Sequence, residues 1–312
     1  MLDFHELYGI DVFGALPLDV CIISKPYLLD RASITKDGSV LLFLLPYYTH
    51  GGEGGNVSMY AAAEDYHAYC RDLFDDVCSR LSRLCPDAKF CGYADHAPIY
   101  EVDAAAKAHL GVYGKNGLLI SAAYSSFVFI AGIYTSLPAA EWENLVCGVK
   151  YPDDGDNNYE PRRCPDCGRC RSACPANAIL DLGRIDTEKC LSAVTQKKKL
   201  TEADETAVAG AEYVWGCDIC QLVCPYTVAA KAAGTLETPL SYFKEKLIKT
   251  LDEDTLTALA EKGQFGRRAF SWRGEETVRR NLRLHDKTDT EINDTEKDFT
   301  NNDHYLDRKT ED

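Results

Sequence analysis

Eight cysteines in two runs are the residues of this chain best suited to redox chemistry. The first run, C-x2-C-x2-C-x3-C-P, consists of Cys164, Cys167, Cys170 and Cys174 followed by Pro175. The second, C-x2-C-x3-C-P, consists of Cys217, Cys220 and Cys224 followed by Pro225, and Cys190 stands upstream of it. In a run of the first kind, three thiolates hold one [4Fe-4S] cluster and the fourth ligates a second. We therefore predict two [4Fe-4S] clusters.

The spacing also predicts a crossed assignment of cysteines to clusters. One cluster is expected on Cys164, Cys167, Cys170 and Cys224, and the other on Cys174, Cys190, Cys217 and Cys220. The three closely spaced thiols wrap one cluster. The three residues before the fourth cysteine turn the chain into a helix directed at the second cluster, as in bacterial ferredoxins. A pair of structural zinc sites is the alternative, since C-x2-C pairs also bind zinc.

The sequence predicts that these thiols are in a reducing compartment. The N-terminus has acids where a signal peptide needs bases, and no apolar run reaches the length of a membrane span, so we expect a cytoplasmic protein. Because cytosolic thiols stay reduced, the fourteen cysteines favour metal ligation over disulfides, and the six outside the two runs are expected to be buried apolar thiols. A net charge of -15 argues against a broad nucleic-acid-binding surface.

The elements around the cysteines predict an α/β or α+β architecture. Strands are expected at 39–48, 89–93, 117–121 and 126–135, a long helix at about 60–84, and a shorter helix within 99–110 that ends at Gly111. We predict an α/β domain over 1–150, a ferredoxin-like double-cluster domain over 151–230 and a helical segment over 231–285. Residues 286–312 read as an acidic disordered tail.

Further motifs follow one another in a recognisable order. "YAAAEDYH" (60–67) is similar to Y-A-x-G-x-D-Y-H, "YADHAPIYE" (93–101) to V-D-x-x-P-x-x-E, and "LGVYGKNGLLI" (110–120) to L-G-W-x-G-K-N-x-L-L-I. With "GCDICQLVCP" and "FGRRAFSWRGEETVRRNLRL", they resemble the epoxyqueuosine reductases over roughly residues 55–285. Those enzymes depend on cobalamin and iron-sulfur clusters and finish queuosine biosynthesis on tRNA. The resemblance implies a corrinoid-binding-like α/β domain.

The resemblance also implies a mechanism in which the clusters reduce cobalamin, cobalamin reduces an epoxide, and an acid protonates the departing oxygen. The acid is the aspartate of V-D-x-x-P, here Asp95. Asp95 follows the strand "KFCGY", and ligands of open α/β sheets lie beyond the carboxyl ends of the strands. A helix N-cap near Ala97 is the alternative role for this residue. Holding a proton near neutral pH requires a raised pKa, which a dry pocket would provide.

The matched motifs supply the expected cofactor contacts. These are Tyr60, Asp65, His67, Pro98, Lys115 and Asn116. For His67 we favour helix packing or a hydrogen bond to the corrin side chains over axial ligation of cobalt. Lys115 and Asn116 stand in a glycine-flanked turn, and a turn that merely needs Gly111 and Gly114 is the alternative.

The expected partners are a tRNA carrying epoxyqueuosine and an external low-potential electron donor, with no membrane. The basic residues that could meet an RNA are Lys197–Lys199 and the arginines between Arg267 and Arg283. Two alternatives remain: a corrinoid and iron-sulfur reductase with a different substrate, and a two-cluster electron-transfer protein without cobalamin. Ala62 and Ala63, which replace an arginine and a glycine of the first motif, keep the second alternative open.

Overall fold

A four-stranded antiparallel sheet forms the centre of the first half of the protein. A computed structural model describes residues 1–151 and 159–285. Its strands are β1 (Phe13–Pro17), β2 (Ser39–Pro46), β6 (Val128–Thr135) and β3 (Phe90–Ala94), in that spatial order. Every neighbouring pair is antiparallel. The mixed architecture is as expected, but the rule for ligands of open α/β sheets that was applied to Asp95 does not hold for this sheet, because β3 runs antiparallel to β6.

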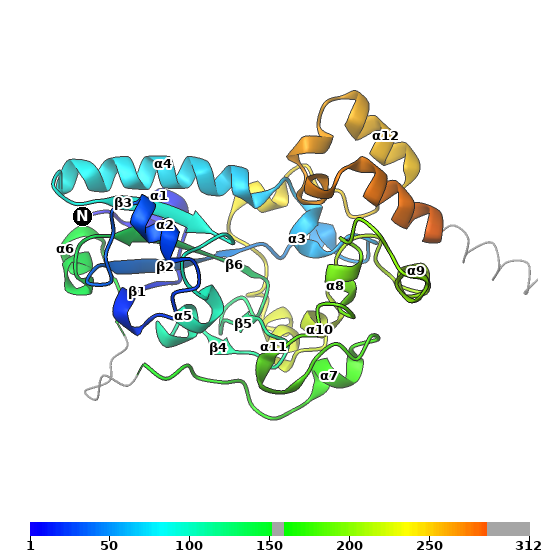
Figure 1. The fold of residues 1–312 in the computed structure, drawn as a ribbon, viewed down its shortest axis with the longest axis horizontal. Coiled ribbons are helices and arrows are strands. Elements are labelled where there is room, and N and C mark those ends of the chain that lie inside the picture. The colour runs from blue at the N-terminus through cyan, green and yellow to red at the C-terminus, as the bar shows by residue number, and fades with distance from the viewer. Residues whose placement is uncertain (152–158, 286–312) are drawn as a thin grey trace, which may run out of the picture.

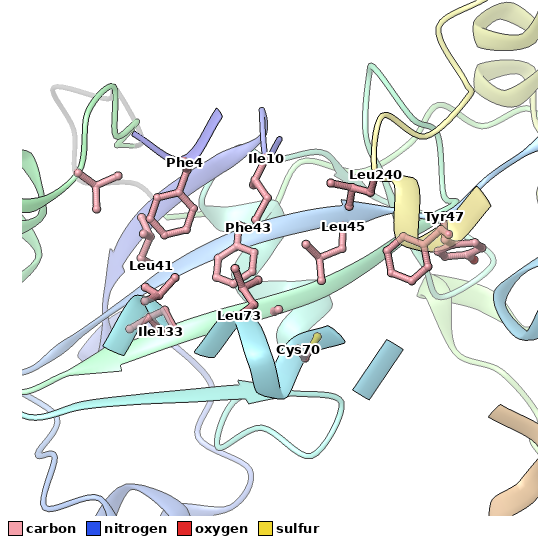
Figure 2. Packing of buried hydrophobic residues seen from close by; sticks show 14 of the residues in the cluster. Phe4, Ile10, Leu41, Phe43, Leu45, Tyr47, Cys70, Leu73, Ile133 and Leu240 are labelled. Carbon is pink, nitrogen blue, oxygen red and sulfur yellow. The ribbon is translucent and has the colours of Figure 1, made fainter. Parts of the chain in front are cut away.

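Helices cover both faces of this sheet. α4 (Tyr66–Leu84) lies on one face and α5 (Glu101–Lys107) on the other (Figure 1). β2 is therefore apolar on both sides, and all eight of its residues are buried. Figure 2 shows Phe43 and Leu45 beside Leu73 and Cys70 of α4. Each fully buried leucine or phenylalanine contributes about 1.5–3 kcal/mol, so this packing holds α4 against the sheet.

The expected helix at 60–84 is two helices. α3 (Met59–Ala62) ends before Ala63, and α4 begins after Asp65, whose carboxylate accepts a hydrogen bond from the backbone of His67. The single-helix prediction was wrong because Asp65 caps a new helix, as short acidic side chains do. The break turns the chain between α3 and α4, so α3 does not continue the direction of α4.

Three further expectations differ in detail. β1 was not anticipated, and the predicted strand at 117–121 is only β5 (Leu119–Ile120), paired with β4 (Val112–Tyr113) outside the main sheet. Gly111 does not cap α5. The cap is Ala108, and His109 takes the left-handed backbone with φ +58°. The remaining predicted strands are confirmed within a few residues.

The second half of the chain consists mainly of short helices, and its last part packs against the first half. Its helices are α7 (Arg169–Ala173), α8 (Leu191–Val194), α9 (Glu202–Ala209), α10 (Ile219–Leu222), α11 (Pro225–Ala232), α12 (Glu253–Glu261) and one over residues 275–285. The first half adds α1 (Phe4–Tyr8), α2 (Pro26–Arg31) and α6 (Trp142–Leu145). Val57 and Ala61 pack with Trp215, Leu256 and Phe270. The helical C-terminal segment thus shares a core with the first half.

The four-part division of the chain stays a prediction. Its boundary at 150/151 adjoins residues 152–158, and the acidic tail at 286–312 lies outside the described residues. Within the described ranges, no helix is long and apolar enough to cross a membrane.

Candidate active site and cluster-binding cavities

The eight motif cysteines line two cavities, four in each. Cys164, Cys167, Cys170 and Cys224, which we call the outer set, line a small cavity. Cys174, Cys190, Cys217 and Cys220, the inner set, line a larger one that we call the central cavity. Across the described residues, no three His, Cys, Asp or Glu side chains are spaced to hold a single metal ion. Each set instead surrounds a space, which a cluster would require and one zinc ion would not.

The pKa shifts of the cysteines group the thiols into the same two sets. Burial raises the pKa of Cys217 to about 11, with contributions from Cys190 and Cys174. Burial also raises the pKa of Cys170, and the charges of Cys164, Cys167 and Cys224 raise this pKa further. Iron coordination would keep these groups as thiolates. α7, which contains Cys170, packs against α10, which contains Cys220, so the two cavities are neighbours.

Helix ends and backbone amides position the thiols. Cys190 and Cys224 precede the first turns of α8 and α11, and Cys174 follows the last turn of α7. The backbone of Lys115 donates to Cys164 Sγ and that of Ala178 donates to Cys174 Sγ, each at 3.3 Å. Such N–H···S bonds stabilise thiolate ligands and tune cluster potentials.

The central cavity lies between the inner set and the end of the sheet. Its volume is about 500 Å³, within the range of small-molecule sites. Tyr66 of α4 and Phe129 of β6 stack at 3.8 Å between ring centroids and form part of its wall. Most of the remaining lining is apolar, so the cavity suits a large ligand with an apolar face.

Three buried polar atoms of the central cavity lack a hydrogen-bond partner. They are Glu101 Oε1, Asn116 Nδ2 and Ser126 Oγ. A buried donor or acceptor left unpaired costs about 1–3 kcal/mol, and such atoms are uncommon in native structures unless a ligand pairs with them. Asn116 also lines the outer set's cavity, so it stands between the two cluster positions. These atoms mark the central cavity as a ligand site.

Two carboxyl groups line this cavity together with the inner set. Asp95 follows β3 with φ +63°, in the left-handed region, and its side chain is 72% exposed. It is not the cap of α5, whose N-cap is Tyr100, so the capping alternative fails. Burial raises the pKa of Glu101 to about 8, the charge of Asp95 adds to the rise, and the Asp95 backbone and Lys25 oppose it. Glu101 therefore holds a proton at neutral pH.

Asp65 and His67 do not line the cavity but connect to it through Asp95. His67 Nδ1 lies 2.7 Å from Asp65 Oδ1, and its Nε2 lies 3.8 Å from Asp95 Oδ2. The hydrogen bond to Asp65 raises the pKa of His67, since it stabilises the imidazolium. The His67 side chain is half-exposed and that of Asp95 is 72% exposed, so both groups can exchange protons with solvent.

The other expected contacts divide between the cavities and the loops. Tyr60 and Asn116 line the central cavity. Lys115 lies at the outer set's cavity and forms an ion pair with Asp166. Pro98 is buried away from both, and its carbonyl accepts the backbone N–H groups of Ser24 and Lys25. Pro98 thereby anchors the loop that carries Asp95.

The structure adds residues that the sequence analysis did not assign. Glu101 ends the V-D-x-x-P-x-x-E motif, so its position was visible, but nothing in the motif indicates a raised pKa. Ser126 and Phe129 look like ordinary strand residues in the sequence. Asp218, between two inner-set cysteines, is buried and accepts hydrogen bonds from Ser58 Oγ and Met59 N, each at 2.6 Å. It fastens the inner cysteine loop to α3.

Comparisons with known proteins agree with this geometry. Residues 163–227 match the family model of a 4Fe-4S double cluster binding domain. An epoxyqueuosine reductase of Lactococcus garvieae is 30% identical over 230 residues, covering 73% of this chain and 60% of that protein. One of Synechocystis is 35% identical over 203 residues, covering 63% and 65%. The chain thus spans less than two thirds of either relative.

Solved structures show the same fold. The epoxyqueuosine reductase of Streptococcus thermophilus superposes with a TM-score of 0.67 at 21% identity, covering 90% of this chain and 78% of that one. An epoxyqueuosine reductase crystallised with an epoxyqueuosine-modified tRNA stem loop gives 0.66 at 19% identity, with the same coverage. The chain is thus similar in sequence to the epoxyqueuosine reductases and shares their fold, and residues 163–227 match a 4Fe-4S double cluster binding domain.

Proposed function

We propose that this protein is an iron-sulfur and cobalamin-dependent reductase that converts epoxyqueuosine to queuosine in tRNA. The observation that carries the proposal is the central cavity, whose lining combines four thiols with two acids. Removing an epoxide oxygen as water consumes two electrons and two protons. The cavity offers a supply of each.

The electron supply is proposed to run from the outer set to the inner set. We assign one [4Fe-4S] cluster to each set, with the crossed ligation that the motif predicts. The adjacency of Cys170 and Cys220 supports direct transfer between them. The inner cluster would then stand at the wall of the central cavity, where a second cofactor can receive its electrons.

The second cofactor is proposed to be cobalamin. Tyr60, Asn116 and Ser126 would hold it through polar contacts, while Tyr66 and Phe129 offer an aromatic surface. When bound, the corrinoid supplies a low-potential metal centre that passes electrons to an electrophilic carbon. The unpaired Asn116 Nδ2 and Ser126 Oγ support a ligand with hydrogen-bonding side groups.

The protons are proposed to come from the two acids of the central cavity, Glu101 and Asp95. Glu101 would supply one proton, and Asp95, which is exposed beside His67, would take a second from solvent. Asp95, exposed and directed at the cavity, is proposed as the acid that protonates the leaving oxygen. Asp65 holds the His67 ring in position through its hydrogen bond.

The first test is an anaerobic titration of the cluster-reconstituted protein with cob(II)alamin, followed by electron paramagnetic resonance. Loss of the axial nitrogen splitting at stoichiometric protein is expected, followed by queuosine formation on an epoxyqueuosine stem loop. Asp95→Asn should bind cobalamin equally and lose turnover, whereas Asp103→Asn, on α5 but outside the cavity, should keep both. An unchanged spectrum at saturating protein would make the chain a two-cluster electron carrier.

A second candidate is the same chemistry on a substrate other than tRNA. The net charge of -15 disfavours RNA, and several basic residues offered for RNA contact are paired within the chain. Lys197 pairs with Asp204, Arg279 with Glu275 and Arg283 with Glu276. Salt-dependent binding of the stem loop separates the two candidates, because phosphate contacts release counterions. The cytoplasmic location stays a prediction.

A further inference from the structure

The cluster ligands differ in their access to solvent. Of the fourteen cysteines, all within the described ranges, Cys167 alone is exposed. The inner set lines the central cavity instead. Because electron tunnelling weakens steeply with distance, a partner that contacts the surface at Cys167 would reduce the outer cluster first. The outer set is therefore the more accessible of the two sets for an electron donor at the surface.

Basic residues surround this point of entry. Residues 162–174 contain four arginines, all exposed, and one acid. We call Arg162, Arg163, Arg169 and Arg171 the arginine surface. The one acid, Asp166, is neutralised by Lys115. Within the described ranges, no ion pair involves Arg162 or Arg169. The surface is positive on a chain whose net charge is -15.

Exposed apolar side chains adjoin the arginine surface. Leu182 is 71% exposed and Leu180 40% exposed, on the turn that follows the cysteine run. Arg171 of α7 pairs with Asp181 of this turn at 2.8 Å, so the leucines are held next to the arginines. Transient electron-transfer interfaces are small and combine an apolar contact with a charged rim.

We propose that the arginine surface docks an acidic one-electron carrier protein, a low-potential flavoprotein or iron-sulfur protein. The carrier loses one electron and the outer cluster gains it, with no proton or group transferred, and two such events supply the two electrons of the proposed reduction. The rest of the negative chain repels an acidic partner and orients it toward this surface. The inference rests on the proposed function only for the fate of the electrons.

RNA is the other polyanion that arginines attract, and the structure favours a different place for it. Single-stranded nucleic acid stacks on exposed aromatic rings. Within the described ranges, the exposed aromatic paired with an arginine is Trp272, 58% exposed, with Arg273 3.7 Å from its ring. Trp272 belongs to the C-terminal segment with α12, while α7 lies at the opposite edge of the molecule (Figure 1). On the arginine surface, Arg163 itself covers Tyr113.

The test compares a charge reversal on the arginine surface with an equal one elsewhere. The variant is Arg162→Glu with Arg169→Glu, and the matched control is Lys198→Glu with Lys199→Glu, also exposed and also changing four charges. The reconstituted proteins are mixed anaerobically with a reduced acidic flavodoxin, and cluster bleaching is followed by stopped flow. Photoreduced deazariboflavin, a small reductant that needs no docking, reports cluster integrity.

The arginine variant should be reduced by the flavodoxin about 10- to 100-fold more slowly at low salt, in the range of electrostatic steering. The wild-type rate should fall with added salt, and the deazariboflavin rate should not change. An unchanged flavodoxin rate, or an equal loss in the lysine control, would overturn the proposal. So would loss of stem-loop binding with an unchanged flavodoxin rate, which makes the surface an RNA site. Because cluster bleaching needs no substrate, failure of epoxide reduction is a separate outcome.

Discussion

The titration of Glu101 is the sharpest consequence of the site geometry. Its pKa of about 8, against 4.5 for an ordinary glutamate, corresponds to about 5 kcal/mol at about 1.4 kcal/mol per unit. Between these values the folded protein keeps a proton that the unfolded chain has released. The contribution of Glu101 to the free energy of unfolding therefore falls by about 1.4 kcal/mol per pH unit as pH rises. The figure is an upper limit, since water entering the cavity would solvate the carboxylate.

Infrared difference spectroscopy of the reconstituted protein measures this titration without unfolding it. A protonated-carboxyl band should disappear with a midpoint near pH 8 and be absent in Glu101→Gln. Asp95→Asn should move the midpoint down, because the charge of Asp95 contributes to the rise. Asp103→Asn, ion-paired with Lys107 on the same helix, is the matched control and should leave the band in place.

The charged groups that bear on Glu101 are known, so a different midpoint has few explanations. Asp95 and Lys25 act on it, and it acts on Tyr66, Cys70 and Tyr134. If the band titrates near pH 4.5, or persists in Glu101→Gln, then the central cavity does not desolvate this carboxyl. In that case Glu101 supplies no proton at neutral pH, and the proton supply proposed above rests on Asp95 and His67 alone.

Three more changes test the remaining parts of the site. Asp95→Asn should lower the rate of epoxide reduction about 10²- to 10⁴-fold, the usual contribution of a general acid, with iron content unchanged. Cys174→Ala should halve the iron content, and adding Cys217→Ala should remove no more, because both belong to the inner set; a further loss would contradict crossed ligation. Asp218→Ala should lower the free energy of unfolding of the reconstituted protein by about 3–5 kcal/mol, because it leaves the buried donors of Ser58 and Met59 unpaired. An unchanged denaturant midpoint would show that Asp218 does not hold the inner cysteine loop to α3.

The cysteine pattern was informative because its spacing is itself the structural constraint. Three thiols with two residues between neighbours can surround one centre, and the following Cys-Pro starts a new direction of the chain. The two cavities contain the cysteines in the sets that this spacing predicts. By contrast, the strand pattern predicted where strands lie but not their direction. Apolar runs such as 39–46 look the same in a parallel sheet and in an antiparallel sheet covered on both faces.

Residue roles that depend on the assembled cavity could not be predicted from the sequence. Lys115 and Asn116 are neighbours in one turn, yet Lys115 pairs with Asp166 at the outer set while Asn116 reaches the central cavity. Likewise, Asp95 and Glu101 are six positions apart in one motif and have opposite environments. Asp95 is largely exposed, whereas Glu101 Oε1 is buried without a partner. Burial sets the pKa of a carboxyl, and a linear motif carries no information about burial.

The positions of the cysteines and of the acids indicate where electrons and protons would enter in the proposed reaction. Electrons can enter where Cys167 is exposed, and the adjacent Cys170 and Cys220 connect the outer set to the inner set. In the proposed reaction protons enter at Asp95 and His67, whose side chains are 72% exposed and half-exposed. In the proposed reaction the electrons and the protons reach the central cavity through different residues and combine there at the substrate. An enzyme that joins two electrons and two protons at one oxygen benefits from such a separation.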